Sequence, residues 1–211
     1  MDTKMSTSQT LTLDERRFLM KLARQAIEAA VAGKPMPPIP EGELTEALRR
    51  PADTFVTLNK FGELRGCIGS LGAGQPLYRS VIDSAQAAAT RDPRFPPVTR
   101  AELPHIEVEI SVLTPARPLT FSSLDELRKL LKPHVHGVII QNGFRRALYL
   151  PQVWEHFEGR HDMVEAFLSS LSMKAGDWTG TLWRDPGTRY EVFEAECFSE
   201  SDLEEDRPVA E

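Results

Sequence analysis

The stretch Leu64-Arg65-Gly66-Cys67-Ile68-Gly69 places one of only two cysteines in the chain between glycines and beside an arginine. Glycine has no Cβ, so a ligand or another segment can closely approach the main chain on both sides of this thiol. A turn at 59–63 separates the stretch from a short strand-forming run at 55–58, which together predict a β-hairpin. We therefore expect Cys67 on the second strand of a hairpin.

Alternation along this strand defines the surroundings of the thiol. Regular pairing places two trios on opposite faces, Arg65, Cys67 and Gly69 on one and Leu64, Gly66 and Ile68 on the other. A thiol beside a guanidinium loses its proton more readily, so Cys67 is the first candidate nucleophile. The alternative is a buried cysteine that acts as a small apolar side chain.

The rest of the chain alternates between helical periodicity and strand patterns. Strand hairpins interleaved with helices, without regular βαβ repetition, predict an α+β fold with an antiparallel or mixed sheet and flanking helices. The expected elements are a capped helix from Thr12 to Gly33, a helix from Pro76 to Pro93, a half-buried strand over 105–113, a short helix over 122–131, a hairpin around Asn142-Gly143, helices over 151–157 and 162–175, and a last strand over 190–198.

Composition bounds the class of protein. With 211 residues, 41% of them apolar, the chain can bury the core of one domain or two subdomains. A net charge of −6 argues against a general nucleic-acid binder. Two cysteines without a Cys-x-x-Cys pair, and no apolar run of ~18 residues, predict a cytoplasmic protein without a membrane span. We expect residues 1–11 and the acidic tail 199–211 to be disordered.

Two further groups near the ends of elements are candidates for anion binding. Arg91, Asp92 and Arg94 can clamp a carboxylate or phosphate, with Asp92 orienting one guanidinium. The alternative is a helix end followed by an Asp-Pro turn. The main-chain amides of Gly66 and Gly69 can hold an anion or oxyanion, although turn geometry alone also explains both glycines.

Two other residues are candidates for proton transfer. Glu109 shares a strand face with Glu107, and a carboxylate there can act as acid or base, although a solvated face is the ordinary explanation. His136 can shuttle a proton, and its alternative is a structural histidine beside Gly137. No nucleotide-binding or zinc-protease motif occurs, so we expect no metal and no cofactor. We expect Trp154, Trp178, Trp183 and Cys197 to pack in the interior.

The cysteine stretch resembles the signature of the AMMECR domain family. Further segments resemble that family in the same order, over about 12–198: Arg91-Asp92-Pro93-Arg94-Phe95, the strand 106–113, His136-Gly137 and Leu150-Pro151-Gln152-Val153-Trp154. Thr90-Arg91 departs from the family's more usual aromatic-Arg pair. The resemblance implies an α+β domain of a larger and a smaller closely packed subdomain, with the signature near a groove between them.

In bacteria, such a domain is similar to protein A of the AmmeMemoRadiSam system, which implies a Memo-like protein and a radical SAM enzyme as partners. Our first hypothesis is an enzyme or substrate-handling subunit, a cysteine-dependent transferase or hydrolase. It would act on a small anionic or carbonyl substrate through Cys67. The second hypothesis is a non-catalytic adaptor of that system. The third, RNA or modified-nucleoside handling, is disfavoured by the acidic charge balance.

Overall fold

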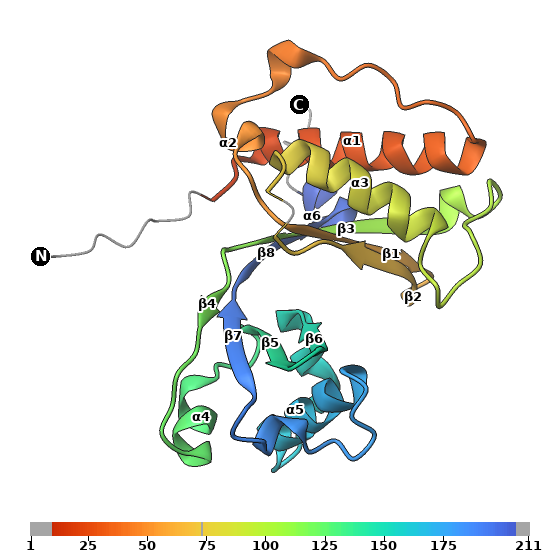
Figure 1. Cartoon of the computed structure of the whole chain (residues 1–211). Coiled ribbons are helices and arrows are strands. Elements are labelled where there is room, and N and C mark those ends of the chain that lie inside the picture. The colour runs from red at the N-terminus through yellow and green to blue at the C-terminus, as the bar shows by residue number, and fades with distance from the viewer. Residues whose placement is uncertain (1–9, 73, 206–211) are drawn as a thin grey trace, which may run out of the picture. The chain divides into compact units, whose positions relative to one another are not determined.

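The computed structural model describes residues 10–72 and 74–205, which belong to two compact units. The first unit consists of the residues up to Leu113 together with those from Glu196 onward, and the second consists of Thr114–Ala195. Each unit holds one four-stranded sheet with helices packed on it (Figure 1). The predicted α+β class is therefore confirmed, with antiparallel strand pairing in both sheets.

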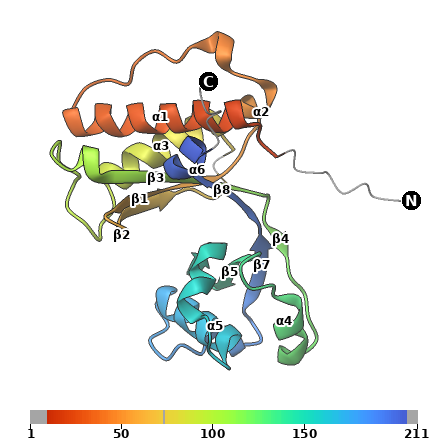
Figure 2. The same cartoon turned by 180° about the vertical axis from the view of Figure 1, so that it is seen from behind.

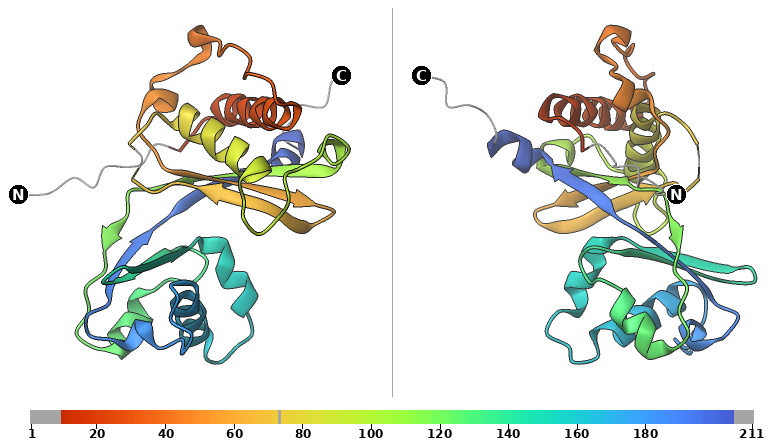
Figure 3. Two further views of the ribbon diagram at one scale, coloured as in Figure 1. Left: turned by 45° about the vertical axis from the view of Figure 1, so that its right-hand side comes forward. Right: turned by 90° about the vertical axis from the view of Figure 1, so that its left-hand side faces the viewer.

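The first unit is a four-stranded sheet in the order β2-β1-β3-β8, with α1 and α3 lying over one face (Figure 3). Its strands are β1 (Thr54–Lys60), β2 (Glu63–Gly69), β3 (Ile106–Leu113) and β8 (Ala195–Ser199). Its helices are α1 (Leu13–Ala32), α2 (Glu46–Arg49), α3 (Leu77–Thr90) and α6 (Glu200–Glu205), with short 3₁₀ turns at Glu41–Glu43 and Leu103–His105. The core between helices and sheet includes the fully buried Leu19, Ile27, Val56, Val81 and Ile110.

Local sequence explains the first helix. Thr12 and Glu15 form the predicted capping box, in which each side chain accepts a hydrogen bond from the other's backbone. Gly33 ends the helix in the left-handed conformation, with φ of 63°, which glycine adopts without a steric cost. The helix thus begins and ends where the sequence predicts.

The hairpin that carries Cys67 is not regular. Gly66 pairs with Leu58, whereas Asn59 pairs with Leu64, so Arg65 is an extra residue in a β-bulge. Leu64 therefore does not join Gly66 in facing α3, and it is 44% exposed. The expectation that Leu64 lies on the same face as Gly66 is wrong, because a bulge shifts the alternation of one strand against its partner.

The chain termini also differ from expectation within the described residues. Residues 200–205 form α6, which packs beside α1 and β3 (Figure 2). Glu200 accepts hydrogen bonds from the Arg24 side chain and from the Val108 backbone, and Leu203 is buried. The acidic tail is therefore ordered over 200–205, and Leu11 is buried too. The remainder of both predicted loose ends, 1–9 and 206–211, lies outside the described residues.

The second unit holds the sheet β4-β7-β5-β6. Its elements are β4 (Arg117–Pro118), α4 (Leu124–Leu130), β5 (Gly137–Asn142), β6 (Arg145–Tyr149), a 3₁₀ segment at Pro151–Phe157, α5 (Met163–Lys174), a 3₁₀ turn at Leu182–Arg184 and β7 (Arg189–Phe193). Trp154 stacks on Phe167 at 3.6 Å in its core, and Trp183 is also buried. Trp178, by contrast, is 89% exposed, so its predicted packing role is wrong.

The expected last strand is two strands. Glu194 separates β7 from β8, and the two belong to different sheets. Apolar residues recur from Tyr190 to Phe198 without a turn signal between them, so the sequence pattern does not show this division. Among the described residues, no helix is long and apolar enough to cross a bilayer.

Candidate functional site

Asp92 joins the loop after α3 to the strand that carries Cys67. One carboxylate oxygen accepts from the Cys67 backbone N–H at 2.8 Å and from Arg94 Nη2 at 2.7 Å. The other accepts from Arg94 Nε at 3.0 Å and from the Arg94 backbone N–H at 3.1 Å. The Asp92 side chain is only 2% exposed. The sequence correctly predicts that Asp92 orients a guanidinium, but all four bonds go to the protein itself.

The electrostatics of this pair follow from its geometry. Hydrogen bonds from the Arg94 guanidinium, opposed by burial, lower the pKa of Asp92 to about 2. The same pairing raises the pKa of Arg94, with a smaller contribution from Cys67. Asp92 is therefore ionised at neutral pH, and its charge is balanced by Arg94 within the pair.

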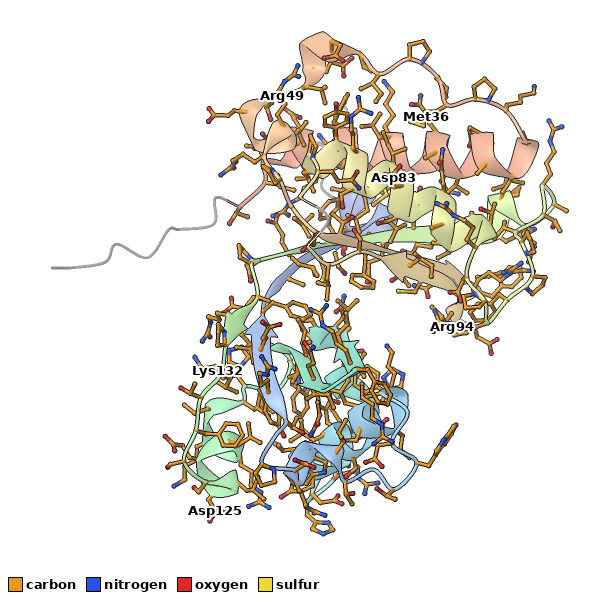
Figure 4. All side chains as sticks on the ribbon, in the orientation of Figure 1. Met36, Arg49, Asp83, Arg94, Asp125 and Lys132 are labelled. Atoms are coloured by element: carbon orange, nitrogen blue, oxygen red, sulfur yellow. The ribbon has the colours of Figure 1, made fainter. Side chains whose placement is uncertain are left out.

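Arg94 also contacts Cys67 directly. Its Nη2 donates to the Cys67 carbonyl oxygen at 3.2 Å, so both main-chain groups of Cys67 are bonded to the loop rather than to β1. The Arg94 side chain is 53% exposed, and Nη1 has no hydrogen-bond partner among residues 10–72 and 74–205. Figure 4 shows Arg94 on the loop at the end of the first unit's sheet. One edge of this guanidinium is thus held and the other faces solvent.

The thiol of Cys67 is half-buried and has a polar neighbour across the ladder. Thr57 lies opposite Cys67, and its hydroxyl donates to Sγ at 3.3 Å. Because the Cys67 main-chain groups point away from β1, the two residues form a non-hydrogen-bonded pair, in which side chains lie closer together. Thr57 is a site residue that the sequence analysis missed, since only the strand register brings it to the thiol.

The Arg65 guanidinium pairs with Glu102. Its Nε and Nη2 donate to the two carboxylate oxygens of Glu102 at 3.0 and 3.2 Å, and Lys60 Nζ donates to Glu102 at 3.0 Å. These bonds, with Arg65 first, hold the pKa of Glu102 well below its usual range. Glu102 was missed by the sequence analysis because it lies on a loop distant in sequence from β2.

Phe95 connects the two arginines. The Arg65 guanidinium lies 5.8 Å from the centre of the Phe95 ring, and that of Arg94 lies 5.5 Å from it. Both distances fall within the range of cation–π attraction. The loop from Asp92 to Glu102 is thus fixed to β2 at both ends and supported by an aromatic ring between them.

The two glycines of the signature have different roles. A Cβ on Gly66 would lie 2.4 Å from the Ala88 carbonyl oxygen, so Gly66 permits the close approach of α3. Its main-chain groups alternate with those of Cys67 and point toward β1, which removes its amide from the predicted anion site. Gly69 has the same parity as Cys67, so its amide points to the outer edge of β2, and its anion-binding role stays a prediction.

Glu109 lies in the same cross-strand row as the thiol. Thr57 pairs with Cys67 on one side and with Glu109 on the other. Strands are spaced about 4.8 Å apart, so Glu109 is about 10 Å from Cys67 in the ladder. Direct proton transfer between them is therefore not supported, and a role for Glu109 requires a group between the two.

His136 lies in the second unit, where its ring has local partners. The Lys132 backbone N–H donates to Nδ1 at 3.2 Å, and Arg117 Nη2 lies 3.4 Å from Nε2. Burial, followed by the charge of Arg117, lowers the pKa of His136. The structural alternative explains these contacts, and the structure does not bring His136 together with the thiol in one unit.

Arg91 and Cys197 are both exposed. Arg91 ends α3 and is exposed, and within the described part of the chain its guanidinium has no hydrogen bond or ion pair. Cys197 is exposed on β8, so the expectation that it lies in the core is wrong. Since β2 and β8 are opposite edges of the sheet, about 14 Å apart, the two cysteines are too distant for a disulfide.

Together these contacts describe a surface that presents a thiol, a hydroxyl and a half-exposed guanidinium on a fixed main chain. A thiol so placed can attack an electrophilic carbon, while the free edge of Arg94 can hold an anion beside it. Among the described residues, no group of three or more acidic, histidine or cysteine side chains is arranged to hold a metal ion.

Comparison with known proteins identifies the family of this chain. The AMMECR1 family model matches residues 20–198. A protein of Methanothermobacter thermautotrophicus is 42% identical over 195 residues, which cover 90% of this chain and 96% of that protein. A protein of Methanopyrus kandleri is 40% identical over 203 residues, covering 93% of each chain.

A solved structure supports the same relationship. The crystal structure of uncharacterized protein PH0010 from Pyrococcus horikoshii is similar to this chain with a TM-score of 0.77 and 36% sequence identity. The similarity covers 87% of this chain and 90% of that chain. The fold and nearly the whole length are therefore shared with these relatives.

Proposed function

The chain belongs to the AMMECR1 family, and we propose that its functional surface is centred on Cys67. The chain then acts as an enzyme or substrate-handling subunit for a small anionic or carbonyl-bearing substrate. The observation that carries the proposal is the Asp92 carboxylate, which holds the Cys67 main chain and the Arg94 guanidinium at once. A buried carboxylate bonded to both groups fixes the thiol relative to a cation.

The proposed chemistry uses these groups in one step. The Cys67 thiol loses its proton to solvent, and the thiolate sulfur forms a bond to the substrate carbonyl carbon. The carbonyl π electrons move to oxygen, and the free edge of Arg94 binds the resulting oxyanion. Thr57 donates a hydrogen bond to sulfur, which stabilises the thiolate before the attack.

Family resemblance supports the proposed setting, a system with a Memo-like protein and a radical SAM enzyme. A non-catalytic adaptor is the second candidate function. A nearly fully exposed aromatic side chain in the second unit favours it, Trp178 at 89% exposure. Exposed aromatics of this size are enriched where proteins bind one another.

Alkylation rates test the catalytic proposal. Cys67→Ser and Cys197→Ser each leave one thiol, and iodoacetamide labelling is followed by intact mass between pH 6 and pH 9. Burial raises the pKa of the Cys197 thiol even though its side chain is partly accessible, which makes it an internal reference. We expect Cys67 to react about tenfold faster than Cys197 at pH 7, because thiolate and not thiol is the nucleophile.

Arginine variants identify the source of this reactivity. Arg94→Gln removes the cation that contacts Cys67, whereas Arg91→Gln removes an exposed cation without such a contact. We expect Arg94→Gln to slow labelling of Cys67 severalfold and Arg91→Gln to leave it unchanged. Equal labelling rates for Cys67 and Cys197 in the two single-thiol variants, with no arginine substitution, would refute the catalytic proposal and favour the adaptor.

A further inference from the structure

The tip of the β1–β2 hairpin contains a residue in an unfavourable conformation. Phe61 has φ of 54° and Gly62 has φ of 81°, so both central residues of the turn Lys60-Phe61-Gly62-Glu63 are left-handed. This is the geometry of a type I′ turn, for which glycine, asparagine and aspartate are the favoured residues. A bulky side chain in this conformation is strained. Strained residues of this kind are held by the surrounding structure and cluster at functional sites.

The strained residue is also exposed. Phe61 is 77% exposed, and Leu64, displaced from the helix-facing side by the bulge, is 44% exposed. The ring of Phe61 lies 5.1 Å from that of His105, and Lys60 Nζ lies 6.0 Å from its centre. Phe61 is thus supported from the side of the first unit while much of its surface faces solvent.

We propose that Phe61 and Leu64 form a docking tip for a partner protein that offers an apolar pocket with a carboxylate at its rim. An aromatic ring on a short, hydrogen-bonded hairpin is ordered before binding, so little entropy is lost when the ring enters a pocket. Lys60 supplies the complementary charge. Its ammonium has three donors, Glu102 accepts from one of them, and the side chain is 32% exposed beside the ring.

The docking tip adjoins the Cys67 surface. Leu64 precedes Cys67 by three residues on β2, which is about 10 Å along a strand. Lys60 and Arg65 share Glu102, and Arg65 lies against Phe95 beside Arg94. A partner bound to the tip therefore lies within reach of the thiol. The docking tip does not depend on the proposed catalysis, since a non-catalytic chain would use it equally.

The test begins with Phe61→Asn, which removes the aromatic ring without destabilising the turn, so that a loss of binding cannot be attributed to unfolding. Asparagine favours the left-handed conformation, so this variant relieves the strain, and we expect its melting temperature to rise. Phe144→Asn is the matched control, because Phe144 is 96% exposed in the turn of another hairpin and has no positive φ. A photo-cross-linking phenylalanine analogue at position 61, or at 144 as control, then marks the neighbours of each site in cells of the source organism.

Any protein that cross-links only through position 61 is purified and titrated against the full chain by calorimetry. The proposal expects one-to-one binding that weakens at least tenfold with Phe61→Asn, severalfold with Lys60→Gln and less than twofold with Phe144→Asn. Equal affinity for Phe61→Asn and the unsubstituted chain, or no cross-link specific to position 61, overturns it. Phe61-dependent sedimentation with phosphatidylcholine and phosphatidylglycerol vesicles, without a protein partner, overturns it in favour of a lipid surface.

Discussion

At the scale of single residues, Asp92 is the group on which the Cys67 surface depends. Its carboxylate accepts four hydrogen bonds while its side chain is almost fully buried. Three of the four come from Arg94, and the fourth comes from the backbone of Cys67. Removing the charge would leave these donors poorly matched, because an amide offers one acceptor oxygen in place of two.

We expect Asp92→Asn to lower the free energy of unfolding at pH 7 by about 2 kcal/mol. The folded pKa of about 2 lies below the ordinary value of 3.8, so this stabilisation is complete above pH 4 and is lost as pH falls toward 2. Urea unfolding at pH 7, 4 and 2.5 measures it. The difference between the variant and the unsubstituted chain should shrink at pH 2.5, and a difference independent of pH would contradict the assignment.

The sequence predicts part of this residue-level geometry. An Asp-Pro-Arg turn is local, so pairing of Asp92 with Arg94 can be expected from spacing alone. The bond from Asp92 to Cys67 cannot, because it joins a helix end to a strand that only the fold brings near. Thr57 and Glu102 were missed for the same reason, and Leu64 was misplaced because alternation carries no signal of a bulge.

At the scale of elements, the contact of β2 with α3 sets the position of the thiol. Gly66 lies against the Ala88 carbonyl oxygen, and the Asp92 loop continues directly from the end of α3. The helix and the strand must therefore keep their separation for Asp92 to reach Cys67. The many alanines of α3, among them the buried Ala85 and Ala88, permit this close approach.

We expect Gly66→Ala to destabilise the protein by about 2 kcal/mol, because a Cβ placed 2.4 Å from a backbone oxygen forces the helix away from the strand. Gly42→Ala is the control, since a Cβ there meets nothing within 4 Å. Thermal unfolding followed by circular dichroism compares the two. Displacement of α3 should also change the rate of Cys67 alkylation, so a Gly66→Ala variant with unchanged stability and labelling would show that the contact is not restrictive.

At the scale of the whole molecule, the chain forms two units that differ in their tryptophan content. All three tryptophans lie in the second unit, two of them buried and one exposed. Tryptophan fluorescence therefore reports on Thr114–Ala195. Sequence patterns predicted the elements of both units well, but the division of the last strand into β7 and β8 needed the tertiary structure, because each half buries side chains in a different core.

Asp177 is the second unit's counterpart to Asp92, and fluorescence can test it. Its carboxylate accepts from the Thr179 hydroxyl at 2.6 Å and from the backbone N–H groups of Thr179, Thr181 and Leu182. The Thr179 bond, ahead of the backbone bonds, lowers the pKa of Asp177 to about 2. Stability of this unit should therefore fall as pH drops from about 4 to about 2, when the carboxylate gains a proton that its donors do not favour.

We expect Asp177→Asn to lower the urea midpoint detected by tryptophan fluorescence at pH 7 and to flatten its decline between pH 4 and pH 2.5. Asp125→Asn serves as control, because the Asp125 side chain is 81% exposed on α4 in the same unit and pairs only with Arg128 at 2.5 Å among the described residues (Figure 4). That variant should keep the midpoint and its pH dependence. If Asp177→Asn retained the full decline, other carboxylates of the second unit would have to be responsible for it, and the loop around Trp178 would not owe its order to Asp177.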